Sequence, residues 1–123
     1  MLDRRVLLVE DGPVELHLLT KLLQRKIRDV YSATNGVLAL EMLRSVGTVD
    51  LIITDISMPL MTGFELIAEI RKQGFSMPVV ALSAHSDLET RTAAERAGFR
   101  AVLVKPISKE SLNMLLDFLG TRL

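Results

Sequence analysis

The sequence predicts an α/β fold, in which a doubly wound, five-stranded parallel sheet is covered on both faces by helices. Short apolar runs alternate five times with segments of helical periodicity along the 123 residues. Most of these runs are rich in β-branched residues and are bounded by turn formers, which is typical of strands buried on both faces. Strands that alternate with helices in this way form parallel sheets through right-handed crossovers. The length suits one domain of ordinary size, so we predict that residues 1–123 form a single domain.

Five strands are predicted, and the third organises the others because it ends on a carboxylate. Its apolar run leads into Asp55, and Pro59 and Gly63 follow within a few residues. The second strand is brief and more polar, which predicts a position at the edge of the sheet. The predicted strands cover residues 6–9, 30–32, 51–53, 78–82 and 101–104.

Five helices are predicted between and after these strands. Pro13 suits the first turn of the first helix, while Asp87 and Ser108 can cap the fourth and fifth. The fourth helix carries few large apolar residues, which predicts that it is thinly buried, and Gly98 suits its end. The fifth is predicted to run through Leu119. The predicted helices cover residues 13–25, 37–47, 64–74, 87–97 and 108–119.

The composition excludes several classes of function. Fifteen basic residues balance fifteen acidic ones, so no overall field favours nucleic acid or an anionic membrane. No apolar stretch reaches the length of about 18 residues that a membrane span requires, which predicts no membrane insertion. The start of the chain lacks the features of a signal peptide, and the absence of cysteine suits a reducing compartment. We therefore expect a cytoplasmic domain that contacts no nucleic acid itself.

Charged and polar side chains lie at the carboxyl ends of four predicted strands. Glu10 and Asp11 follow the first strand, Asp55 the third, Ser83 the fourth and Lys105 the fifth. Because parallel strands end at the same edge of a sheet, we expect these side chains to meet. Carboxylates about 4 Å apart repel each other by roughly 4 kcal/mol per pair at an effective dielectric near 20. A cation relieves this repulsion, and carboxylate oxygens with open coordination positions suit Mg²⁺.

The same edge predicts phosphoryl chemistry. Bound Mg²⁺ neutralises a phosphoryl group and orients it against a carboxylate nucleophile, for which Asp55 is the natural candidate. Ser83 can hydrogen-bond one phosphoryl oxygen and Lys105 can pair with another. Taken singly, each residue has a simpler interpretation, because an acid at a strand end is often a helix cap or part of a turn. The shared position at strand ends favours a site over these interpretations.

Six short motifs are shared with a known family: Val9-Glu10-Asp11, Asn35-Gly36 with Ala39-Leu40, Asp55-Ile-Ser-Met-Pro59 with Gly63, Ser83-Ala84, Ala97-Gly98 and Lys105-Pro106. In these motifs the chain resembles the response-regulator receiver domains of two-component signalling, over essentially its whole length. The resemblance implies a flavodoxin-like sheet of strand order 2-1-3-4-5. It also implies that Lys105-Pro106 is commonly a cis peptide.

The same resemblance implies a role for each site residue. Asp55 would accept a phosphoryl group from a phosphohistidine on a histidine kinase or a histidine phosphotransfer protein. Mg²⁺ would be bound by Glu10, Asp11, Asp55 and the backbone carbonyl of Ser57. The Ser83 hydroxyl and the Lys105 amine would contact the phosphoryl group.

Four positions depart from the usual pattern of that family. Val102 stands where an aromatic residue is common, so the rotamer exchange of that aromatic, coupled to the Ser83 position, is absent. Thr62 replaces a frequent Asp, which predicts a lost turn contact. Ser57 and His85 occupy variable positions that flank the site and tune the lifetime of the phosphoryl group. A lone loop histidine is nevertheless usually a solvated side chain.

Two other residue types invite a functional interpretation that the sequence does not favour. His17 lies among the leucines of the first helix and is interpreted as a partly exposed helix residue rather than as a phosphodonor. Met58, Met61 and Met77 are interpreted as packing residues rather than as metal ligands.

Three functions remain open, in decreasing order of support. In the first, phosphorylation of Asp55 shifts the population of a surface that binds an output protein or domain, formed by helix 87–97 and the elements after it. In the second, the chain is a receiver used only for docking, for which Val102 leaves room. The third is a phosphatase of the haloacid-dehalogenase type. Enzymes of that type have a second Asp two residues after the nucleophile, where this chain has Ser57, and their cap domain does not fit within 123 residues. We expect a signalling module rather than an enzyme, with self-phosphorylation and self-dephosphorylation at most.

Overall fold

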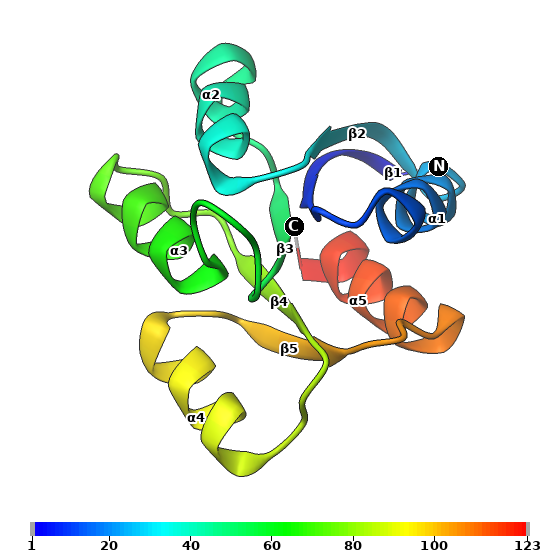
Figure 1. Cartoon of the computed structure of the whole chain (residues 1–123). Coiled ribbons are helices and arrows are strands. Elements are labelled where there is room, and N and C mark those ends of the chain that lie inside the picture. The colour runs from blue at the N-terminus through cyan, green and yellow to red at the C-terminus, as the bar shows by residue number, and fades with distance from the viewer. Residues whose placement is uncertain (1, 123) are drawn as a thin grey trace.

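A computed structural model describes the backbone of residues 2–122 and the side chains of residues 2–117, and these form a three-layer α/β fold. The parallel sheet has the strand order β2-β1-β3-β4-β5. Helices α2, α3 and α4 lie on one side of the sheet, and α1 and α5 lie on the other (Figure 1). The elements are β1 (Leu2–Val9), α1 (Pro13–Gln24), β2 (Ile27–Ala33), α2 (Gly36–Val46), β3 (Leu51–Asp55), α3 (Gly63–Lys72), β4 (Val79–Ser83), α4 (Leu88–Ala97), β5 (Ala101–Val104) and α5 (Lys109–Arg122). The predicted fold class, strand order and edge position of β2 are confirmed.

The inner strands send alternate side chains into two hydrophobic cores, one on each face of the sheet. On β1, Leu7 packs in the core under α2, α3 and α4, while Leu8 packs in the core under α1 and α5. On β3, Ile52 and Ile53 divide in the same way. Each fully buried side chain of this size stabilises the fold by about 1.5–3 kcal/mol. The continuous apolar runs therefore reflect burial on both faces, which fixes the positions of the strand ends that carry the site.

Side chains cap the starts of α2, α4 and α5, and the caps at Asp87 and Ser108 are those that the sequence predicts. The Asn35 side chain accepts a hydrogen bond of 2.9 Å from a backbone N–H in the first turn of α2. Asp87 accepts one of 3.1 Å from the Thr90 backbone at the start of α4, and the hydroxyl of Thr90 also donates to Asp87 and lowers the pKa of its carboxyl group. The Ser108 hydroxyl accepts one of 3.0 Å in the first turn of α5. Each such cap contributes about 1 kcal/mol to helix stability.

The expected loss of a turn contact at Thr62 is wrong. Its hydroxyl accepts a hydrogen bond of 3.2 Å from the Glu65 backbone, and the Glu65 side chain accepts one of 3.0 Å from the Thr62 backbone. This reciprocal arrangement satisfies two backbone donors at the start of α3. Thr62 therefore makes a turn contact, through its hydroxyl group.

Strands β1 and β2 are longer than predicted. Leu2 at the start of β1 pairs with Ile27 at the start of β2, before the buried part of β1 begins at Val6. In residues 2–5, before that buried part, side chains alternate between half-buried and exposed. Charged residues occupy this stretch, so the apolar run that signals a buried strand begins only at Val6.

The structure confirms the prediction that α4 is thinly buried. In α4 only Ala94 is buried, and Leu88 is 80% exposed, so this helix is thinly buried as predicted. Leu112 and Leu116 of α5 are buried, whereas the side chain of Leu119 lies outside the described residues. Among residues 2–122, no helix has the length and apolar character that a membrane crossing requires.

Candidate functional site

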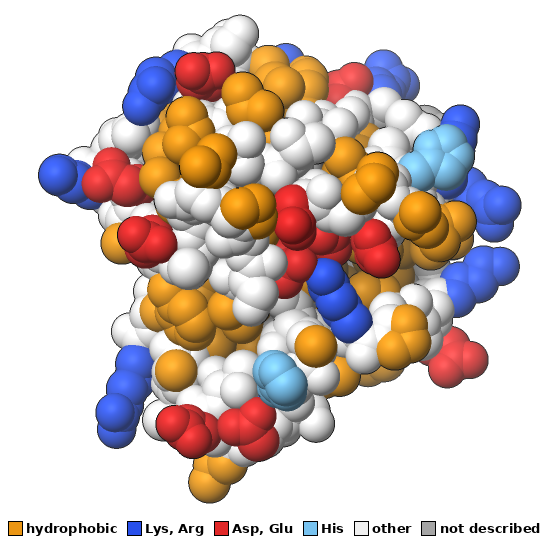
Figure 2. Space-filling view, viewed as in Figure 1, with side chains coloured by type: hydrophobic (Ala, Val, Ile, Leu, Met, Phe, Trp, Pro, Cys, Tyr) orange, Lys and Arg blue, Asp and Glu red, His pale blue; other side chains and the backbone are white. Residues whose placement is uncertain are grey.

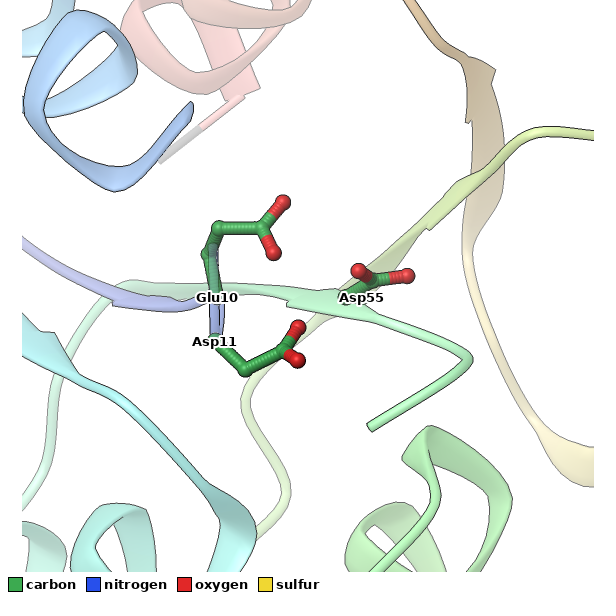
Figure 3. Close-up of side chains that lie close together, drawn as sticks. All are labelled: Glu10, Asp11 and Asp55. Carbon is green, nitrogen blue, oxygen red and sulfur yellow. The ribbon is translucent and has the colours of Figure 1, made fainter. Parts of the chain in front are cut away.

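Three carboxylates gather at the carboxyl edge of the sheet, as the sequence predicts. Val9 of β1 pairs with Thr54 of β3, which places Glu10 beside Asp55. One carboxylate oxygen from each of Glu10, Asp11 and Asp55 lies within 4.8 Å of the other two. Figure 3 shows Glu10 and Asp11 at the end of β1 pointing toward the same space as Asp55, and Figure 2 shows acidic side chains gathered near the middle of this face. The three side chains form one cluster of oxygen atoms.

The three acids differ in exposure. Glu10 and Asp55 are 1% and 6% exposed, whereas Asp11 is an exposed residue. Removing a charge from water is costly unless partners compensate it. The two buried carboxylates therefore require donors nearby.

Lys105 supplies the main compensation. Its Nζ lies 2.7 Å from Glu10 Oε1 and 2.7 Å from Asp55 Oδ2. Burial lowers the pKa of the Lys105 ammonium, but its hydrogen bonds to Asp55 and Glu10 and the attraction of their charges together outweigh this effect, so the pKa lies above its ordinary value. The Lys105 backbone N–H donates to Ser83 O at 2.8 Å, and the Lys105-Pro106 peptide is cis, as the resemblance implies.

Backbone N–H groups hold the remaining carboxylate oxygens. The N–H of Ser57 donates to Asp55 Oδ1 at 3.2 Å, and that of Gly12 donates to Glu10 Oε2 at 3.1 Å. Among the described residues, no hydrogen bond or ion pair fixes the side chain of Asp11. Two carboxylates are thus held in place, and the third is free to adjust to a ligand.

Ser83 lies on the neighbouring strand and is buried. Asp55 pairs with Leu82 across β3 and β4, so Ser83 is the next residue along the same edge. Its hydroxyl oxygen accepts a hydrogen bond of 3.0 Å from the backbone N–H of His85. The hydroxyl hydrogen is left to donate elsewhere. The side chain of His85 is exposed.

The donor set fits a divalent cation of the Mg²⁺ type. Such a hard cation prefers carboxylate oxygens, carbonyl oxygens and water, and Glu10, Asp11 and Asp55 offer a close group of such oxygens. One ammonium group faces two buried carboxylates, so positive charge is in deficit at the cluster. Glu10, Asp11 and Asp55 therefore offer the kind of oxygen ligands that such an ion prefers.

Gly63→Ala is expected to lower the free energy of unfolding by about 1–3 kcal/mol, because it crowds the end of β3. A Cβ atom at Gly63 would lie 2.6 Å from the backbone oxygen of Asp55 and 2.9 Å from the Cα of Ile56, and backbone atoms cannot rotate aside. Urea unfolding measures the loss. Gly36→Ala is the matched control, since its Cβ would meet the flexible side chain of Met61. A loss at Gly63 no larger than the loss at Gly36 would contradict this account.

Some functional contacts at the site were not predicted from the sequence. The sequence places Lys105 at the edge but does not show that it pairs with two acids at once. Gly63 belongs to a recognised motif, and its close approach to Asp55 became visible only in the structure. The spacing from Asp55 to Gly63 was the available signal.

Residues outside the site lie where the sequence places them. His17 is exposed on α1. Met58 and Met77 are buried in the core under α2, α3 and α4, and Met61 packs against that core. Their interpretation as packing residues is confirmed.

Comparisons with known proteins agree with this geometry. Residues 6–117 match the family model described as the response regulator receiver domain. The chain is 38% identical over 112 residues to the transcriptional regulatory protein GlrR of Escherichia coli, covering 91% of this chain and 25% of that protein. It is 31% identical over 120 residues to the sensor histidine kinase RcsC of Salmonella typhi, covering 98% of this chain and 13% of the kinase. The chain thus spans a quarter or less of the length of these relatives.

Solved structures show the same fold. The receiver domain of the Francisella response regulator 1452 is 30% identical, with a TM-score of 0.85 and coverage of 98% of both chains. The chemotaxis protein CheY4 of Vibrio cholerae is 29% identical, with a TM-score of 0.88 and coverage of 96% of this chain and 99% of that one. Together with the matched residues 6–117, these likenesses show that the chain belongs to the response regulator receiver domain family of two-component signalling.

Proposed function

We propose that Asp55 accepts a phosphoryl group from a phosphohistidine on a histidine kinase or histidine phosphotransfer protein. The observation that carries this proposal is the position of the Asp55 carboxylate, which lies among Glu10, Asp11 and the Lys105 ammonium. A carboxylate oxygen attacks phosphorus and a P–O bond forms. The P–N bond to the donor imidazole breaks, and its electron pair returns to the ring. The product is an acyl phosphate on Asp55.

We assign Mg²⁺ binding to Glu10, Asp11 and Asp55, with the backbone carbonyl of Ser57 as a further ligand. The cluster of oxygen atoms and its deficit of positive charge support this assignment. When bound, the ion supplies positive charge against the phosphoryl oxygens.

Ser83 and Lys105 are assigned to the phosphoryl oxygens. Lys105 contacts Asp55 at 2.7 Å, so its ammonium lies within reach of a group that forms on that carboxylate. The Ser83 hydroxyl accepts from the His85 backbone and keeps its own hydrogen for a phosphoryl oxygen. Phosphoryl transfer depends mostly on positioning and charge stabilisation, and both residues serve these ends.

The phosphorylated domain acts as a signal rather than as a catalyst with turnover. We infer that residues 1–123 form one receiver domain, which works in the cytoplasm. Its output is a change in a protein-binding surface. A receiver used only for docking is less well supported, because the acids, hydroxyl and lysine lie together at one edge.

Labelling with acetyl phosphate tests the function directly. Incubation with Mg²⁺ should place one phosphoryl group on Asp55, as read by peptide mass spectrometry, and omission of Mg²⁺ with a chelator present should remove the label. Acetyl phosphate supplies the phosphoryl group without a partner protein, so the result depends on this chain alone. Label on another acid would refute the assignment of the nucleophile. Sustained hydrolysis of added phosphate esters without bound label would favour a phosphatase.

A further inference from the structure

Helix α4 buries little of its own surface, and further contacts lie in the segments just before and just after it. Ala94 is its one buried residue, while Leu88 at its start is 80% exposed. A helix with so little buried apolar surface has low local stability. Contacts made by the segments just before and just after α4 therefore contribute much of what fixes the position of this helix.

The attachment before α4 starts at the site. The Ser83 hydroxyl oxygen accepts a hydrogen bond from the His85 backbone at 3.0 Å. Asp87 then caps the helix. The position of the start of α4 is therefore linked to a hydroxyl group at the phosphoacceptor edge.

The attachment after α4 is an aromatic contact with α3. The rings of Phe64 and Phe99 meet edge to face, with centroids 5.7 Å apart and planes at 82°. Phe99 is 6% exposed, and its backbone N–H donates to Ala94 O at 3.0 Å, after Gly98 in the left-handed conformation. Aromatic rings in this geometry attract each other beyond the effect of their burial.

This second attachment also leads back to Asp55. Phe64 follows Gly63, whose N–H donates to Ile56 O at 2.8 Å. A Cβ atom at Gly63 would lie within 2.6 Å of the Asp55 backbone oxygen, so the start of α3 is in close contact with the end of β3. Because the backbone at Gly63 is packed against the end of β3, a movement of the end of β3 is expected to displace Gly63 and the adjoining Phe64.

We propose that the Phe64–Phe99 contact transmits the phosphorylation state of Asp55 to the C-terminal end of α4. This inference rests on the proposed function, because it requires a phosphoryl group on Asp55. Val102 offers no aromatic ring on β5, whereas the Phe64–Phe99 pair joins α3 to the turn that leads into β5. Both phenylalanines act as positioning residues, since neither contacts the reacting atoms.

Hydrogen exchange with and without phosphorylation tests the contact. Protein is incubated with acetyl phosphate and Mg²⁺ or with Mg²⁺ alone, and exchange is compared in peptides covering residues 84–100. The parent should show a phosphorylation-dependent difference in these peptides, and Phe99→Leu and Phe64→Leu should lose that difference in the peptides covering residues 94–100. Phe75→Leu is the matched control, because Phe75 packs on the same core at the far end of α3 and should keep the difference.

The design separates coupling from stability. A merely structural role changes exchange equally in both phosphorylation states, whereas coupling changes the difference between them. The two variants remove the same ring contact from opposite sides, and half-buried Phe64 is the milder site should Phe99→Leu unfold. The Asp55 label is read in the same samples. Two outcomes overturn the coupling alone: a folded, normally labelled variant that keeps the full exchange difference, or a normally labelled parent that shows no difference. A parent that carries no label on Asp55 overturns the proposed function instead.

Discussion

Lys105→Met is expected to lower the free energy of unfolding of the metal-free protein by about 3 kcal/mol, within the range for loss of one partner from a buried charge pair. Methionine keeps most of the side-chain length but removes the charge that faces Glu10 and Asp55 at 2.7 Å each. Both carboxylates are buried, so water compensates them poorly once the ammonium is gone. Urea unfolding in the presence of a chelator measures the loss.

A matched control separates this effect from the loss of any surface lysine. Lys72 pairs with Glu69 at 4.0 Å, and its side chain is 79% exposed, so Lys72→Met should change stability by less than about 1 kcal/mol. Added Mg²⁺ should restore part of the loss in Lys105→Met, because it brings positive charge back to the cluster. Equal losses in the two variants would show that Lys105 does not compensate the buried acids.

The contacts of Lys105 modify the sequence-based expectation that only a metal ion compensates the clustered carboxylates. From the sequence, repulsion among three carboxylates requires a cation. In the structure, the ammonium of Lys105 already contacts two of them. The cluster therefore has a partial counterion before any metal binds, and Asp11 remains as the exposed acid without a fixed partner among the described residues.

The sequence predicted the fold and the residues that gather at the sheet edge, because both follow from hydrophobic periodicity and from the positions of residues at strand ends. Apolar runs buried on both faces identify the strands, and the ends of parallel strands share one edge. Glu10, Asp55 and Lys105 come together for that reason, although 95 residues separate the first from the last. No side-chain contact had to be known to reach that result.

The contacts that the sequence did not predict depend on side-chain reach and ring orientation. Phe64 and Phe99 lie 35 positions apart in the numbering, and no periodicity indicates that their rings meet. Thr62 makes its turn contact through a hydroxyl group, which a comparison based on the usual Asp overlooks. The ring contact follows from packing after the elements are placed, so a pattern of residue types does not specify it. The Thr62 contact is different, because Thr62-Gly-Phe-Glu65 fits the local pattern of a capping box and was an available signal.

Asp11→Asn is expected to weaken Mg²⁺ binding by roughly tenfold or more, since loss of even an outer-shell contact typically costs that much. Asp11 is exposed and has no fixed partner among the described residues, so stability without metal should hardly change. Melting temperature measured across a Mg²⁺ titration reports both quantities, because a ligand that binds only the folded state raises it. Acetyl phosphate labelling of Asp55 should need correspondingly more Mg²⁺.

Two further variants define the result. Asp11→Asn combined with Asp55→Asn should abolish the Mg²⁺-dependent rise in melting temperature, because one of the three clustered carboxylates then remains. Asp29→Asn, the same change on edge strand β2, should leave that rise intact. If the parent melts at the same temperature with and without Mg²⁺, or if Asp11→Asn responds as the parent does, these oxygens do not hold the ion. Since Lys105 already contacts Glu10 and Asp55, the exposed Asp11 is the acid whose loss separates metal binding from stability most cleanly.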